Sequence, residues 1–129
     1  MSRQKQLLSV IAFGGYPDFT ALYEQHNYQV TSCKTLRKAL ALIKQLSPEI
    51  IVAEFVYAPT YGSQLSNFES LFAAAETFAP QAQLIALAHP ADLAHLDKVK
   101  AQNERCIVLP FPVSTKDMDD CLNSVTETE

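Results

Sequence analysis

The sequence predicts an α/β fold of three layers, a doubly wound sandwich in which helices cover both faces of a five-stranded parallel sheet. Its short apolar runs are mostly continuous rather than alternating, as in strands that are buried on both faces. Segments with helical periodicity separate the runs, and this strict alternation implies right-handed crossovers. The expected strands cover residues 7–13, 28–33, 50–55, 84–88 and 106–109.

Each expected helix carries an apolar stripe at the spacing i, i+3, i+4, i+7 or a part of it. The stripes contain Phe19, Leu22, Tyr23 and His26; Leu36, Ala39, Leu40 and Ile43; Leu65, Phe68, Phe72, Ala75 and Ala79; Leu93, Leu96 and Val99; and Met118, Cys121, Leu122 and Val125. Pro17 suits the first position of the first helix. Ser114 and Asp117 resemble a capping box at the start of the last helix.

The composition is that of a packed soluble chain. The length of 129 residues predicts one domain, residues 1–129, with a core over about residues 5–125. The net charge of -4 argues against a nucleic-acid partner, because phosphate binding requires clustered Lys and Arg. The apolar run near the N-terminus is too short to span a membrane, and no cleavage site follows it. We therefore expect a cytoplasmic protein without a membrane partner.

The side chains that most often carry chemistry do not form a recognisable set. The three cysteines lack a C-x-x-C pair and are expected to be buried, reduced thiols. The three histidines lack the spacing of metal ligands, and no serine lies in a nucleophile elbow. These residues are Cys33, Cys106 and Cys121, and His26, His89 and His95. The sequence therefore predicts a protein that is not an enzyme and has no metal and no cofactor.

The centre of the chain carries a familiar arrangement. Residues 28–54 read strand, helix and strand, and the last apolar run ends in one acid, Glu54. A fourth strand follows at residues 84–89, and Val-Leu-Pro-Phe at residues 108–111 ends the fifth. Over about residues 5–125 this pattern resembles the receiver domain of response regulators. The resemblance implies a flavodoxin-like sheet of order 2-1-3-4-5, with the functional crevice at the carboxyl ends of the strands.

The resemblance fails at the positions that carry phosphotransfer. An active receiver domain holds Mg²⁺ with an acidic pair beside an acceptor aspartate, and a hydroxyl and a lysine bind the phosphoryl group. Here the acidic pair aligns with Gly14 and Gly15, the acceptor with Glu54, the hydroxyl with Ala88 and the lysine with Leu109. The resemblance thus implies a degenerate, non-phosphorylatable pseudo-receiver. Glu54 either mimics a phosphorylated aspartate permanently or is a solvated carboxylate without a role.

Two functions are compatible with this sequence. The first is a phosphorylation-independent regulator or adaptor in a bacterial two-component pathway, which binds a signalling protein or forms a homodimer. The resemblance places its candidate interface on the fourth helix, fifth strand and fifth helix, at Leu93, Leu96, Lys98, Lys100, Arg105, Asp117, Asp119 and Asp120. The alternative is a small-molecule or anion sensor, which would use the crevice near Gly14, Gly15, Tyr57 and His89.

Overall fold

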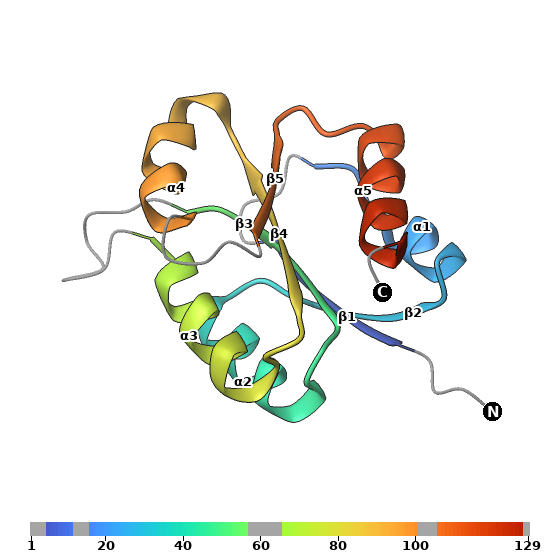
Figure 1. Ribbon diagram of the computed structural model, residues 1–129, viewed down its shortest axis with the longest axis horizontal. Coiled ribbons are helices and arrows are strands. Elements are labelled where there is room, and N and C mark those ends of the chain that lie inside the picture. Colours follow the sequence, from blue (N-terminus) through green and yellow to red (C-terminus); the bar gives the residue numbers. More distant parts are fainter. Residues whose placement is uncertain (1–4, 12–15, 57–65, 101–105, 128–129) are drawn as a thin grey trace.

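Five parallel strands form one sheet in the order β2-β1-β3-β4-β5, as predicted (Figure 1). The structure is a computed structural model and describes residues 5–11, 16–56, 66–100 and 106–127. The strands are β1 (Lys5–Val10), β2 (Tyr28–Cys33), β3 (Ile50–Glu54), β4 (Gln83–Ala88) and β5 (Cys106–Pro110). Each crossover between consecutive strands contains a helix, which confirms the doubly wound α/β class.

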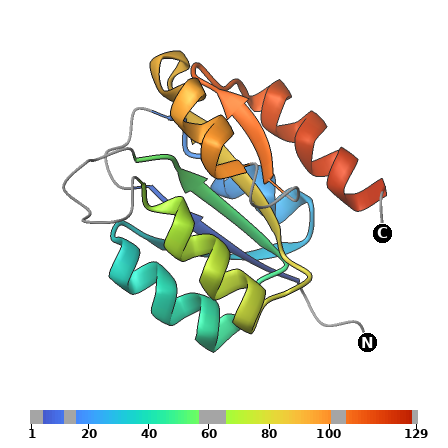
Figure 2. The same ribbon diagram turned by 60° about the vertical axis from the view of Figure 1, so that its left-hand side comes forward.

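Helices cover both faces of this sheet, so the three layers are confirmed (Figures 1 and 2). On one face, α2 and α3 lie side by side, and α4 lies nearer β5. The other face carries α1 and α5. The helices are α1 (Thr20–Gln25), α2 (Leu36–Leu46), α3 (Phe68–Phe78), α4 (Leu93–Lys100) and α5 (Thr115–Glu127), and a short 3-10 helix, η1 (Pro90–Asp92), leads into α4.

The central strand β3 divides the core into two halves. Ile51 and Ala53 pack with the α2–α3 side, and Ile50 and Val52 pack with the α1–α5 side. All five residues of β3 are buried, including Glu54 at its end. This burial explains why the strand reads as a continuous apolar run, since both of its faces lie under helices.

Strand β1 begins earlier than its apolar run. Lys5 and Gln6 pair in register with Tyr28 and Gln29 of β2. The backbone N–H of Gln6 also donates to the carboxylate of Glu49. The expected range 7–13 missed this start because Lys5 and Gln6 are polar, and residues 12 and 13 lie outside the described residues.

The predicted start of the first helix is wrong. Pro17 was expected in its first position, but α1 begins at Thr20 and has only six residues. The carboxylate of Asp18 accepts a hydrogen bond from the backbone N–H of Thr20 at 2.9 Å. This local bond fixes a turn before the helix, as aspartate often does at helix starts. Pro17 and Asp18 therefore lie in an exposed segment that precedes the helix.

Two later helices begin with side-chain caps. At α5, the N–H of Asp117 donates to Ser114 Oγ and the N–H of Ser114 donates to the Asp117 carboxylate, both at 3.0 Å. This reciprocal pair confirms the predicted capping box. At α2, Thr35 Oγ1 accepts from the N–H of Lys38 at 3.1 Å. Both caps satisfy backbone donors that have no partner within the helix.

All three cysteines are free, and Cys106 and Cys121 are buried as expected, whereas Cys33 is only half-buried. Among the described residues, no helix combines the length and the apolar character that crossing a bilayer requires.

Candidate functional site

Three side chains at the carboxyl ends of β3, β4 and β5 face the same side of the sheet. Ile50 and Val52 contact the core on the α1–α5 side. Because side chains alternate along a strand, Glu54 points to that side as well. The same alternation places the side chains of His89, which follows β4, and Phe111, which follows β5, on the α1–α5 side of the sheet. The sheet therefore gathers these three groups at one edge.

Tyr16 joins this edge from the segment before α1. Its ring lies 5.5 Å from that of Phe111 in an edge-to-face arrangement and 6.2 Å from that of His89. The rings of His89 and Phe111 are 4.5 Å apart. These centroid distances are typical of favourable aromatic contacts. Tyr16, His89 and Phe111 form what we call the aromatic cluster.

The hydroxyl group of Tyr16 is buried and has no hydrogen-bond partner among the residues that the structure describes. Burial is the main cause that raises the pKa of Tyr16 to about 12, and the negative charges of Glu54 and Asp92 add to the effect. The phenol is therefore protonated at neutral pH. It brings an aromatic ring, rather than a cation, close to the carboxylate at the end of β3.

Glu54 itself is buried, with only 5% of its surface exposed. A solvated strand-end carboxylate, one of the two expectations for this residue, is therefore wrong. The backbone on either side of it is also held in place. Asn67 Nδ2 donates to the carbonyl of Glu54, and Asn67 Oδ1 accepts from the N–H of Val56, both at 2.9 Å. Asn67 thus joins the end of β3 to the start of α3.

Comparison with solved structures finds proteins with the same fold. The chain is similar to the signal receiver domain of a putative Luxo repressor protein from Vibrio parahaemolyticus (13% identity, TM-score 0.71, 98% of this chain and 92% of that chain). It is also similar to a response regulator receiver domain protein from Clostridium thermocellum (17% identity, TM-score 0.68, 96% and 95%). The chain has the receiver fold. A structure named adenylate cyclase, from Rhodopirellula baltica, matches as well (19% identity, TM-score 0.69, 97% and 89%).

These similarities establish the fold alone, because the sequence identities are low. No protein-family model matches the chain, and no curated protein matches it either. The resemblance seen in the sequence is thus confirmed at the level of the receiver fold.

Among the described positions that align with receiver chemistry, only Glu54 has a polar side chain. Ala88 is buried, and Leu109 is half-buried and packs against the α1–α5 core. Gly14 and Gly15 lie outside the described residues, as does Tyr57 of the alternative sensor site. Within the described part of the chain, no three His, Cys, Asp or Glu side chains are grouped so that they could hold a metal ion.

The candidate interface on α4, β5 and α5 is smaller than expected. Leu96 is fully buried in the core beneath α4, so its place in the interface is a wrong expectation. Leu93 is half-buried and packs against the same core. Both lie on the apolar stripe of α4, which faces the sheet rather than solvent. The side chain of Lys98 is exposed.

The three aspartates of the candidate interface differ in their surroundings. Asp117 and Asp120 are exposed on α5. Asp119 instead bonds to His26 Nε2, at the end of α1, at 2.7 Å. The side chain of Lys100 and residue Arg105 lie outside the described residues.

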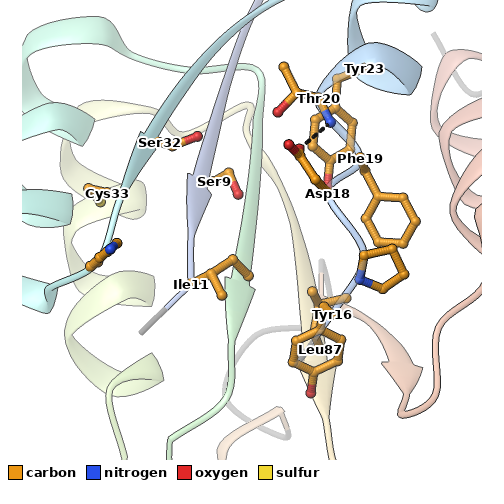
Figure 3. Close-up of a pocket in the computed structure, with 12 residues that line it drawn as sticks. Ser9, Ile11, Tyr16, Asp18, Phe19, Thr20, Tyr23, Ser32, Cys33 and Leu87 are labelled. Carbon is orange, nitrogen blue, oxygen red and sulfur yellow. Dashed lines mark hydrogen bonds between the residues drawn. The ribbon is translucent and has the colours of Figure 1, made fainter. Parts of the chain in front are cut away.

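A pocket that the sequence analysis missed lies between α1 and the ends of β1 and β2 (Figure 3). Its volume is about 490 Å³. Residues Ser9, Ser32 and Lys34 contribute from the strand side, and Asp18 and Thr20 from the start of α1. The sequence feature that indicates this pocket is the short spacing before β2. This spacing leaves room for a first helix of only six residues, which does not cover the carboxyl ends of β1 and β2.

Proposed function

We propose that this chain is a non-catalytic pseudo-receiver, which regulates a signalling pathway by binding a protein and without being phosphorylated. The burial of Glu54 at the acceptor position is the observation that supports it most. Phosphoryl transfer requires access for the donor and cations that neutralise the developing charge. Glu54 is 5% exposed, and its near neighbour Tyr16 is an uncharged phenol.

The surroundings of Glu54 support a single conformation rather than a switch. Asn67 fixes the backbone at the end of β3, and the aromatic cluster joins the ends of β4 and β5 to the segment before α1. Both Ala88 and Leu109 lack a group that would bind a phosphoryl oxygen. The buried carboxyl group of Glu54 at the end of β3 is in keeping with a permanent mimic of a phosphorylated aspartate.

The proposed contact surface consists of the exposed parts of α4, β5 and α5. Lys98 lies on α4, and Asp117 and Asp120 lie on α5, while β5 is an edge strand between these helices. A protein partner with complementary charges fits this surface. A second copy also fits, because a two-fold axis places the basic side of each copy against the acidic side of the other.

Charge reversal on this surface tests the proposal. We expect Lys98→Glu or Asp120→Lys to weaken capture of the native partner by about two- to fivefold, because single rim charges contribute little affinity. Affinity capture from the native cell and sedimentation velocity measure the two kinds of partner. Lys38→Glu, an exposed lysine on α2, is the matched control. Equal capture by all four proteins, with no self-association, would contradict the proposal.

The small-molecule alternative is supported by a different observation, the pocket beside α1. This pocket lies over β1 and β2, whereas the proposed contact surface lies at β5, the opposite edge of the sheet. The two functions are therefore separable by experiment.

A further inference from the structure

The floor of the pocket beside α1 carries two adjacent hydroxyl groups. Ser9 of β1 and Ser32 of β2 are register partners. Leu7 and Val30, two residues earlier in their strands, pack toward the α1–α5 side. Both serines therefore face that side, at the point where the short α1 stops covering the sheet.

The wall formed by the segment before α1 carries a fixed negative charge. Asp18 accepts the hydrogen bond from the N–H of Thr20, and Figure 3 shows its carboxylate turned toward the serine side of the pocket. Hydrogen bonds from Thr20, first from its side chain and then from its backbone, lower the pKa of Asp18. The carboxylate is therefore ionised at neutral pH and held in one orientation.

The strand wall carries the opposite charge. Lys34 follows the last residue of β2 and lines the pocket from that side. The lining also includes apolar side chains, with Ile11 and Leu87 as aliphatic contacts and Tyr23 as an aromatic one. The volume of about 490 Å³ lies within the range of small-molecule sites, about 300–1,000 Å³.

We propose that this pocket binds a free α-amino acid with an apolar side chain. Its ammonium group would pair with Asp18, its carboxylate with Lys34, and its side chain would lie against Ile11 and Leu87. The serine hydroxyls would donate to or accept from the polar ends.

Ligands with one kind of charge fit this lining less well. A phosphate or a nucleotide would place negative charge beside Asp18. A polyamine would place positive charge beside Lys34. A zwitterion has a charge for each wall, since opposite charges attract and like charges repel.

The pocket is connected to the end of β5 through Tyr16. Tyr16 lines the pocket and belongs to the aromatic cluster, where its ring contacts Phe111 after β5. A bound amino acid would touch the ring that packs on the end of β5. Binding in this pocket is independent of the proposed protein-binding function, because the pocket lies beside β1 and β2 and the proposed contact surface lies at β5.

The first test uses the unaltered protein and isothermal titration calorimetry with L-leucine and L-phenylalanine. N-acetyl-leucine lacks the ammonium group and leucinamide lacks the carboxylate. We expect at least one free amino acid to bind, and each derivative to bind about 10- to 100-fold more weakly, as for loss of a charged hydrogen bond. No heat of binding at millimolar amino acid, or equal binding of free and blocked forms, would overturn the inference.

The second test locates the site with variants. Asp18→Asn and Lys34→Gln are each expected to weaken binding about tenfold or more, whereas Asp97→Asn, an exposed aspartate on α4, leaves it unchanged. Two-dimensional NMR confirms that each variant is folded and shows which amides shift. Shifts of Ser9 and Ser32 on adding leucine support the site. Shifts confined to β4 and β5, or tighter binding of a nucleotide or a polyamine, would overturn it.

Discussion

Replacing Phe68 by alanine is expected to lower the free energy of unfolding by about 3–5 kcal/mol, as for other large aromatic residues removed from a core. Phe68 is fully buried at the start of α3. Its ring packs 5.6 Å from that of Phe55, which follows β3, and 5.6 Å from that of Phe72 in the same helix. Alanine would leave a cavity between α3 and the sheet. Urea unfolding measures the loss as a lower midpoint with an unchanged slope.

Phe78 provides the matched control at the other end of α3. It is 38% exposed, and the ammonium group of Lys44 lies 5.7 Å from its ring centroid. Phe78→Ala removes this exposed contact and little buried surface, so we expect a loss of about 1 kcal/mol or less. Similar losses for the two phenylalanines would show that α3 does not pack on the sheet as described.

The second large effect is expected at Asn67. Asn67→Ala removes the two hydrogen bonds that join the end of β3 to the start of α3 and leaves the carbonyl of Glu54 and the N–H of Val56 without this partner. Buried polar groups that lose a partner cost about 1–3 kcal/mol each, and we expect a total loss of about 2–4 kcal/mol. Chemical denaturation followed by circular dichroism measures it.

Asn123→Ala on α5 is the control for this change, because Asn123 is exposed. We expect its effect to stay within about 0.5 kcal/mol. If Asn67→Ala were as mild as Asn123→Ala, the bridge would contribute little to holding Glu54 in place. The end of β3 would then not be fixed by Asn67.

The fold could be predicted from the sequence because the patterns that indicate its strands and helices are local and repeated. Continuous apolar runs such as that of β3 mark buried parallel strands, and the stripe of α2 marks a helix that packs on them. The start of α1 was missed because a single bond from Thr20 to Asp18 outweighs the preference of Pro17 for a first helical turn. Helix ends depend on such individual bonds and are therefore less predictable than strands and helices themselves.

The site could be predicted only in part from the sequence, because its contacts join segments that are distant along the chain. Alternation along the strands places Glu54, His89 and Phe111 on one side, but Tyr16 reaches them through the tertiary fold alone. The burial of Glu54 follows from this packing and was not predictable from its position at a strand end.

The family resemblance places Leu96 in the candidate interface. Leu96 also lies on the apolar stripe of α4, and that stripe indicates a place in the core. The bond between Asp119 and His26 joins residues that are 93 positions apart, and no local sequence pattern predicts it. The pocket beside α1 is indicated in the sequence by the shortened first helix. A short helix indicates that part of the sheet is uncovered, but it does not identify a ligand.

Intact-mass measurement after incubation with a small acyl-phosphate donor and Mg²⁺ tests the central claim most directly. We expect no phosphoryl adduct on the native chain, because Glu54 is buried and Ala88 and Leu109 supply no phosphoryl ligand. Glu54→Asp restores the acceptor type alone and is expected to stay unmodified, while an active receiver domain treated in parallel gains the mass of a phosphoryl group. A stable adduct on Glu54 of the native chain would contradict the account.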